Sequence, residues 1–555
     1  MKMKKMLSLL LLFFLGIGIT NAADIQKVKP VKNVILLIPD GTSLQTVSLA
    51  RWCQWYRNPD KPHLNIDPYI CGTVRSFCSN GPVGDSAPTT SCYMTGYPSI
   101  AGFVSTHPYS AGNDDIYPVD PDKAFQPLAT VLEASRILKN KATGLVFVCE
   151  FPHATPADCA SHSYQRGNYK NIAPQMVHNK VDVVLGGGTS YLNEEGENFL
   201  KNNGYGVFKD DLKGFRSYEG NKMWALFGKG EMEYDLDRNP EEQPSLAEMT
   251  AKAIEKLSKN ENGFFLMVEG SLVDHAGHGN DPVGLFSDFL AFDKACGVAL
   301  DFAKKNGETA IIIVPDHGTG GPSITGGSSY SKTRLFKTLS GFKRTAAGLA
   351  KIVNSRPAEE LPEIFKEYGG IRLTDKEIDA FYNCKGYDKS PIPKDQRKDK
   401  KEDNVLYNNS LTGLISDIIT ARSTVRFTTS GHTAEELFLA AYHPKENLQL
   451  GMIDNIEVNH LLCNLLGFGG ELDNLTASLF AKHYDVFKGM DYEIIPAEEN
   501  GNPTLIVNGK KKIEIQPFTN IIKVDGKEEQ LNSVIVYVDR TNTFYLPQNL
   551  TELTR

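Results

Sequence analysis

Several features that define other classes of protein are missing from this chain. Basic residues do not outnumber acidic ones, and the formal net charge of −8 argues against nucleic-acid binding, which usually needs a basic face. After the first residues, no stretch approaches the roughly 18 unbroken apolar residues of a membrane span. No Cys-x-x-Cys pair occurs, so a zinc cluster held by cysteines is not expected. No convincing internal repeat is present, which leaves a globular chain large enough for a sizeable core.

The first residues have the pattern of an export signal. A basic start, MKMKK, leads into an apolar run from Leu7 to Ile19, and Thr20-Asn21-Ala22 offers small residues that suit cleavage. We therefore predict that residues 1–22 are a signal peptide and that the mature protein, without a membrane span, is periplasmic or secreted. No cysteine follows the cleavage region, so a lipid-anchored lipoprotein is not indicated.

Cysteine is sparse, and its count is odd. An exported location permits disulfides, but nine cysteines leave at least one unpaired unless it pairs between chains. Cys92, Cys149 and Cys296 lie in apolar segments, and we interpret them as small buried hydrophobic residues. The pairing of the other cysteines stays open. The oligomeric state is also open, and a homodimer is one alternative.

Apolar runs alternate with amphipathic segments along the first three hundred residues. Continuous apolar runs suit strands that are buried on both faces of a parallel sheet, and their alternation with helices predicts an α/β fold with helices on both sides of a mostly parallel sheet. The expected strands are 33–40, 144–149, 181–185, 264–269 and 309–314, followed by 436–441 later in the chain, and the expected helices are 43–56, 129–139, 245–257 and 286–305.

Two later regions differ from this pattern. Residues from about 320 to 425 are longer than a simple connection and contain helix-like pieces at 346–353 and 411–420, so we expect an insertion at the rim of the site. After about residue 486, short alternating runs are broken by Asn508-Gly509 and Asp525-Gly526, which are strong hairpin turns. We predict a catalytic domain over 23–485 and a small β-rich module over 486–555.

Acidic and imidazole side chains follow several of the predicted strands. Asp40, Glu269 and Asp316-His317 each stand at the carboxyl end of an apolar strand, where α/β sheets bind their ligands. Asp274 and His278 are four residues apart, a spacing that places both on one face of a helical turn, as zinc ligands often are. Each of these features alone is usually coincidental or structural, but their occurrence together at strand ends predicts a metal centre.

Asp85-Ser86-Ala87-Pro88 follows a glycine-rich approach and has the composition of a helix start. Proline is tolerated in the first turn, and such a turn places the Ser86 hydroxyl beside free backbone N–H groups that attract anions. In isolation, Asp-Ser at this point is more often a plain helix cap. The metal-ligand candidates elsewhere in the chain are what favour Ser86 as a nucleophile.

Six motifs in a fixed order carry a family resemblance. They are IPDG (38–41), DSAPTTSCYMTG (85–96), HATPADCASHSYQR (153–166), VEGSLVDHAGH (268–278), VPDHG (314–318) and TSGHT (429–433). In this order and spacing they resemble the alkaline phosphatases, from the signal-peptide boundary to about residue 470. The insertion and the C-terminal module are not covered by the motifs.

The resemblance implies a phosphate monoester hydrolase with two zinc ions and one magnesium ion per subunit. Ser86 is the implied nucleophile, which forms a phosphoserine intermediate, and Arg166 is the implied phosphate clamp. The implied ligands are Asp274, His278 and His432 for one zinc, Asp40, Asp316 and His317 for the second, and Asp40, Thr155 and Glu269 for magnesium. Two such metals hold both apical oxygens of an in-line displacement, and a guanidinium suits the equatorial phosphate oxygens.

Two positions depart from the best-known bacterial enzymes. His153 stands where those enzymes have an acid, and His275 stands where they have a lysine; both are similar to the animal enzymes. We therefore expect His153 to neighbour the magnesium through water and His275 to contact phosphate only weakly. Asp85 is interpreted as a partner that orients Arg166, and His162 as a structural residue.

Other readings of the same motifs remain. The nearest is a phosphodiesterase or another phospho- or sulfo-ester hydrolase of the same superfamily, although Ser86-Ala-Pro-Thr does not match the sulfatase context. Thr155, Glu269 and Arg166 favour a monoesterase over a diesterase. A non-catalytic binding protein would require a damaged site, and none of the implied positions is missing. The natural substrate among small phosphate monoesters is left open.

Overall fold

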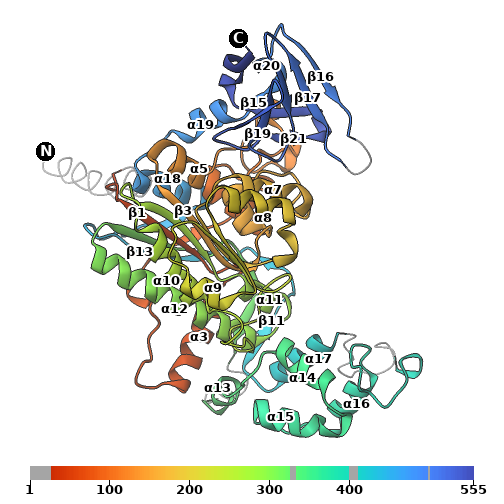
Figure 1. Cartoon of the computed structure of the whole chain (residues 1–555). Helices are drawn as coiled ribbons and strands as arrows, with labels where there is room; N and C mark the ends of the chain where they lie inside the picture. Colours follow the sequence, from red (N-terminus) through yellow and green to blue (C-terminus); the bar gives the residue numbers. More distant parts are fainter. Residues whose placement is uncertain (1–24, 26, 326–332, 399–409, 498–500, 555) are drawn as a thin grey trace, which may run out of the picture.

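A ten-stranded sheet forms the centre of the molecule. The computed structural model describes residues 25, 27–325, 333–398, 410–497 and 501–554, so the predicted signal peptide lies outside the described residues. The strand order is β14-β2-β13-β8-β1-β7-β3-β4-β6-β5 (Figure 1). In that order the strands are Gly451–Asp454, Ile70–Arg75, Leu437–Tyr442, Thr309–Ile313, Asn33–Ile38, Phe264–Glu269, Ala142–Glu150, Val183–Gly187, Met223–Leu226 and Gly206–Lys209.

The sheet is mostly parallel, as the sequence predicts. β1 pairs in parallel with β7 and β8, and β3 pairs in parallel with β7 and β4. The exception is β13, which runs antiparallel to both β8 and β2. The sequence pattern does not reveal four of the ten strands. β2 is only partly buried, and β5 and β14 form the edges of the sheet, whereas β6 is buried but has only four residues.

Helices cover both faces of the sheet, so the side chains of a central strand alternate between two cores. Ile35 and Leu37 of β1 belong to one core, whereas Val34, Leu36 and Ile38 belong to the other. α3 (Leu44–Arg57), α10 (Leu246–Leu257) and α12 (Pro282–Asn306) pack on the first side. α4 (Ser86–Thr95), α5 (Val131–Lys139) and α18 (Asn455–Leu466) pack on the second. Each fully buried aliphatic side chain contributes about 1.5–3 kcal/mol through the hydrophobic effect.

The helix expected at 286–305 begins earlier than the sequence analysis predicts. α12 starts at Pro282, and Asp281 is its N-cap, with the carboxylate accepting the backbone N–H of Val283. Proline suits the first helical turn because its missing N–H has no intrahelical partner there. The start four residues upstream brings α12 close behind the site-bearing α11 (Leu272–His278).

A group of helices extends from the sheet between β10 (Pro322–Ile324) and β11 (Val425–Phe427), which pair with each other. Helical pieces are expected there at 346–353 and 411–420, and α14 (Ala346–Ser355) and α17 (Leu411–Ala421) confirm both. α13 (Thr333–Ser340), α15 (Leu361–Gly369) and α16 (Asp375–Asn383) complete the group, which projects at the lower right of Figure 1.

The C-terminal region is antiparallel, as expected. Five strands form a meander in sequence order: β16 (Asp491–Ile495), β17 (Thr504–Asn508), β18 (Lys512–Ile515), β19 (Ile521–Val524) and β20 (Lys527–Gln530). The predicted turn at Asp525-Gly526 is confirmed, because the two residues have φ of +49° and +77° and directly join β19 to β20. A second sheet of β15 (Ala481–Lys482), β22 (Thr543–Leu546) and β21 (Val536–Val538) lies beside it (Figure 1).

None of the nine cysteines, all of which lie in the described part of the chain, forms a disulfide bond, and Cys92, Cys149 and Cys296 are fully buried, as expected. Among the residues that the structure describes, none of the helices combines the length and the apolar character needed to cross a membrane.

Candidate functional site

Adjacent strands of the sheet deliver carboxylates to one edge. Asp40 lies two residues after β1, Glu269 is the last residue of β7, and Asp316 follows β8. Because β1 is paired in parallel with both β7 and β8, the three carboxyl ends meet, and all three side chains are fully buried. Thr155, on α6 (Ala154–Ala160) after β3, is buried as well.

Gly41 allows this close approach. Its φ is +62°, a left-handed conformation that glycine adopts without strain, and a Cβ at this position would lie 2.5 Å from Asp274 Oδ1. The Gly41 N–H also donates to Asp316 Oδ1 at 3.2 Å. The glycine of the IPDG motif therefore lets the chain turn between two carboxylates.

Ser86 is the first residue of α4, and Asp85 is the N-cap, as the sequence predicts. The Ser86 side chain points into the carboxylate cluster. Its Oγ lies 3.2 Å from His317 Nε2 and donates to Asp40 Oδ2 at 3.4 Å. The hydroxyl is thus buried among candidate metal ligands and beside the positive end of a ten-residue helix.

Three imidazoles are oriented in the same way. The Nδ1 atoms of His278, His317 and His432 lie 2.6, 3.2 and 3.0 Å from the backbone carbonyl oxygens of Ser430, Gly318 and Gly84. A carbonyl oxygen only accepts, so in the neutral form of each ring the proton lies on Nδ1 and the lone pair lies on Nε2. In metal sites, such a hydrogen bond from the ring nitrogen that does not bind the metal orients the histidine ligand.

The imidazole nitrogens and carboxylates lie in two groups, and His278 of the predicted set Asp274, His278 and His432 is outside both of them. Ligand atoms of Asp40, Asp316 and His317 lie within 4.8 Å of one another, and so do those of Asp274, His317 and His432. His278 Nε2 lies 3.3 Å from Asp274 Oδ2 and 3.1 Å from His432 Nε2, although its side chain is 42% exposed. His317 therefore lies between the two groups.

Several buried atoms of this cluster have no hydrogen-bond partner in the part of the chain that the structure describes. They are Asp40 Oδ1, His153 Nδ1, Thr155 Oγ1, Glu269 Oε1 and Asp316 Oδ2. Buried polar atoms are normally satisfied, and buried charges are normally paired or coordinate metals. Four oxygen atoms and one nitrogen atom without hydrogen bonds at one edge of the sheet suit divalent cations as ligands.

Arg166 faces the same cluster from the loop after α6. Its guanidinium lies 3.1 Å from Asp85 Oδ1, and its second terminal nitrogen donates to His153 Nε2 at 3.0 Å. Asp85 also accepts the backbone N–H groups of Ala87 and Gly102, which fixes the carboxylate. The His275 ring meets the His153 ring edge-on, with 6.0 Å between their centroids.

Comparisons with known proteins agree with this geometry. The sequence model of the alkaline phosphatase family matches residues 31–468. The chain belongs to the alkaline phosphatase family.

Relatives support this assignment. Alkaline phosphatase 3 of Bacillus subtilis is 33% identical over 445 residues, which cover 77% of this chain and 87% of that protein. The repressible alkaline phosphatase of Saccharomyces cerevisiae is 28% identical and is covered over 79% of its length, with 77% of this chain. The cold-active enzyme of a Shewanella species is 26% identical, with a TM-score of 0.66 over 78% of this chain and 99% of that one. The Thermus thermophilus enzyme shares the fold, with 23% identity and a TM-score of 0.67 over 79% of this chain and 92% of that one.

Membership in this family makes the chain a phosphoric monoester hydrolase. Burial shifts the pKa values of several carboxyl groups in its site. Burial, reinforced by the nearby Asp316, raises the pKa of Glu269 to about 8. Burial together with Asp316 and Asp274 also raises the pKa of Asp40 well above its usual value. For Asp274 burial acts in the same direction, but the hydrogen bond to His278 and the charge of His317 outweigh it and lower the pKa. Without cations, the site therefore disfavours full ionisation of its carboxylates.

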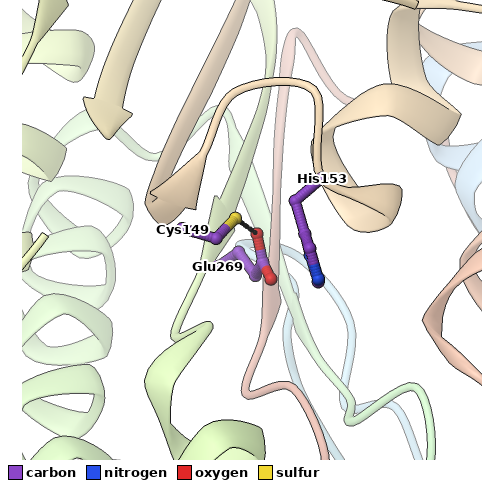
Figure 2. Close-up of side chains that lie close together, drawn as sticks. All are labelled: Cys149, His153 and Glu269. Atoms are coloured by element: carbon purple, nitrogen blue, oxygen red, sulfur yellow. Dashed lines mark hydrogen bonds between the residues drawn. The ribbon is translucent and has the colours of Figure 1, made fainter. Parts of the chain in front are cut away.

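Sequence reasoning missed two residues that contact this cluster. Thr319 donates from Oγ1 to Asp274 Oδ1 at 2.5 Å, and Cys149 donates from Sγ to Glu269 Oε2 at 3.4 Å (Figure 2). Cys149 is buried as expected, but it is not only a hydrophobic packing residue. Its position at the carboxyl end of β3 is the signal that could have found it. His162 has the structural role expected of it, because its ring nitrogens face Glu133 and the Ser105 carbonyl.

The raised pKa of Glu269 predicts the pH dependence of the metal-free protein. The folded state keeps the Glu269 proton up to about pH 8, whereas the unfolded chain loses it near the ordinary value of 4.5. The folded state then binds more protons in this window, so its free energy of unfolding falls as the pH rises. In chelator-treated protein, we expect Glu269→Gln to reduce this pH-dependent loss of stability by about a few kcal/mol, because the variant lacks one buried group that can ionise. Urea titrations between pH 5 and pH 8 measure the free energy of unfolding.

The matched control is Glu308→Gln, at an exposed position away from the site. It should leave the pH dependence as in the parent chain. Equal slopes for the parent and Glu269→Gln would contradict the electrostatic account.

Proposed function

We propose that this chain is an exported alkaline phosphatase that hydrolyses small phosphate monoesters through a phosphoserine intermediate on Ser86. The observation that carries the proposal is the position of Ser86 Oγ. The hydroxyl begins a helix, is buried, and lies within 3.4 Å of both His317 Nε2 and Asp40 Oδ2. A serine hydroxyl is a weak nucleophile unless a neighbouring group activates it, and these candidate metal ligands supply such a setting.

The donor sets support two zinc ions and one magnesium ion. Nitrogen and carboxylate donors suit zinc, and the proposed sets are Asp274, His278 and His432, and Asp40, Asp316 and His317. Carboxylate and hydroxyl oxygens suit magnesium, and the proposed set is Asp40, Thr155 and Glu269, with His153 beside it. When bound, such ions stabilise the charges that develop on the attacking and leaving oxygens.

A magnesium ion in a third site also occurs in a solved relative. Structures of alkaline phosphatase variants from the Antarctic bacterium TAB5, in which a histidine is replaced by aspartate or glutamate, have Mg bound in the M3 site. This chain keeps a histidine at position 153, next to its own proposed magnesium set.

The protein side chains then have distinct tasks. Ser86 attacks the phosphorus atom, and its place at the positive end of α4 favours an anionic substrate. Arg166 binds equatorial phosphate oxygens through two parallel N–H groups, and Asp85 holds the guanidinium in place. Water later attacks the phosphoserine from the side that the leaving group has vacated, which regenerates Ser86 and gives overall retention at phosphorus.

Ser86→Ala tests the nucleophile directly. Turnover of 4-nitrophenyl phosphate should fall by roughly three or more orders of magnitude, because the remaining groups bind phosphate but cannot form the covalent intermediate. Phosphate trapped on the parent protein at acidic pH should map to Ser86 by mass spectrometry. Ser91→Ala, a buried serine on the same helix, should keep activity and folding. Near-normal turnover by Ser86→Ala would reject the assignment.

The substrate class is tested by comparing a monoester with a diester. Arg166 places two N–H groups toward a phosphate with free equatorial oxygens, and a diester lacks one of these oxygens. We therefore expect kcat/KM for 4-nitrophenyl phosphate to exceed that for bis(4-nitrophenyl) phosphate by at least about a hundredfold, roughly the loss of one charge-assisted contact in the transition state. Arg166→Ala should narrow the ratio. A higher rate on the diester would favour the phosphodiesterase reading.

Export rests on the N-terminal pattern alone and has its own test. If residues 1–22 are a signal peptide, the protein expressed in a bacterial host should appear in the periplasm or medium, with its N-terminus at residue 23. N-terminal sequencing of the purified protein measures this. Replacing Leu9 and Leu10 by Asp should retain the full-length chain in the cytoplasm, and an unprocessed, exported chain would contradict the proposal.

A further inference from the structure

The loop that carries Arg166, residues 161–168, is tied by its backbone to the segment that follows Ser86. The Arg166 N–H donates to the Gly102 carbonyl oxygen at 2.7 Å, and the Gly102 N–H donates to Asp85 Oδ2 at 3.1 Å. Ser163 exchanges two backbone hydrogen bonds with Val104, of 2.7 and 2.9 Å. The backbone of the loop is therefore joined to the same carboxylate that faces the Arg166 guanidinium.

Tyr164, on the same loop, contacts the C-terminal module. Its hydroxyl donates to Asp539 Oδ1 in the turn (Asp539–Thr541) between β21 and β22. The Arg540 guanidinium lies over the Tyr164 ring, 5.3 Å from its centroid, and over the Phe125 ring, 5.7 Å from that centroid. The two rings also meet edge-on, with 5.5 Å between their centroids. Two consecutive residues of the module thus hold one side chain of the Arg166 loop.

A groove opens beside this contact. Its volume is about 550 Å³, and its walls include Tyr164 and Asn168 of the loop and Asp539 and Asn542 of the module. Open space supplies no packing atoms to the loop. The hydrogen bond between Tyr164 and Asp539 therefore carries the support that the module gives to the loop at this point.

The module has separate attachments to α5 and to α7 (Tyr169–His178), the helix that follows the loop (Figure 1). Arg136 of α5 donates to the Asn532 carbonyl oxygen at 2.8 Å. His178, the last residue of α7, has its Nδ1 2.9 Å from Asn520 Oδ1. Because these contacts do not involve Tyr164, they hold the module in place as a fixed support for the loop.

We propose that Tyr164 and Asp539 are positioning residues, through which the C-terminal module keeps Arg166 in the orientation that binds phosphate. The inference rests on the phosphate-binding role of Arg166 in the proposed function. A paired contact of two N–H groups with phosphate oxygens requires a fixed guanidinium, and the Arg166 side chain is long and 28% exposed. The module then contributes to phosphate affinity, although none of its residues belongs to the nucleophile or ligand sets.

Tyr164→Phe and Asp539→Ala test the contact in the full-length protein loaded with zinc and magnesium. Each should raise the dissociation constant for inorganic phosphate by about three- to tenfold in equilibrium dialysis, because a displaced guanidinium loses part of its paired contact. Asp539→Asn should keep the parent value, since the amide oxygen still accepts from the Tyr164 hydroxyl. The matched control is Asp491→Ala, which removes a carboxylate bonded to Asn508 within the module and should also keep that value. Unchanged phosphate binding by Tyr164→Phe would overturn the proposal.

A double variant separates positioning from a general structural effect. If Tyr164 acts through Arg166, Tyr164→Phe combined with Arg166→Ala should bind phosphate as weakly as Arg166→Ala alone. A structural role would move this readout differently, because the loss caused by Tyr164→Phe would then be the same in both backgrounds. That additive result would overturn the positioning role.

Failure of the proposed function has a different signature. If Arg166→Ala binds phosphate as the parent does, the phosphate clamp is rejected together with its positioning. If Arg166→Ala weakens binding and Tyr164→Phe does not, the positioning role alone is rejected. Hydrolysis of 4-nitrophenyl phosphate by the parent protein tests the phosphatase activity independently of both.

Discussion

Repulsion among buried carboxylates is the constraint on which the rest of the site depends. The parallel pairing of β1 with β7 and β8 brings Asp40, Glu269 and Asp316 to one edge, out of contact with water. Like charges at this range in a low-dielectric interior cost several kcal/mol unless counter-charges are present. The raised pKa values of Asp40 and Glu269 express this cost, and divalent cations remove it. This cost is the physical reason why the cluster suits the divalent cations proposed for it.

The imidazoles complete this arrangement by being held in advance. His278, His317 and His432 each face a backbone carbonyl oxygen through Nδ1, so their Nε2 atoms are aimed before any ion arrives. The contact of His278 with Ser430 joins residues 152 positions apart, and that of His432 with Gly84 joins residues 348 apart. Metal binding at this site therefore ties distant parts of the chain together and depends on the whole sheet being formed.

The central part of the fold is predictable because its strands are buried on both faces. The runs at Asn33–Ile38 and Phe264–Glu269 are unbroken apolar sequences, so burial itself marks them. Ile70–Arg75 and Gly451–Asp454 are partly exposed and pair through contacts that no local pattern records, so they escape detection. The acids after the central strands are predictable for the same reason as the strands: the end of an apolar run shows where a parallel sheet presents its ligands.

Side-chain neighbours across the sheet are what the sequence does not reveal. Cys149 ends an apolar strand and satisfies every rule for a packing residue, and only the pairing of β3 with β7 places its sulfur on Glu269. Glu269 also belongs to the proposed magnesium set, so a hydrogen bond joins the Cys149 thiol to a proposed ligand of that site. Burial raises the pKa of the Cys149 thiol, so the thiol keeps its proton and helps to orient Glu269 through this hydrogen bond. The orientation of Glu269 thus depends on a residue that belongs to none of the ligand sets implied by the motifs.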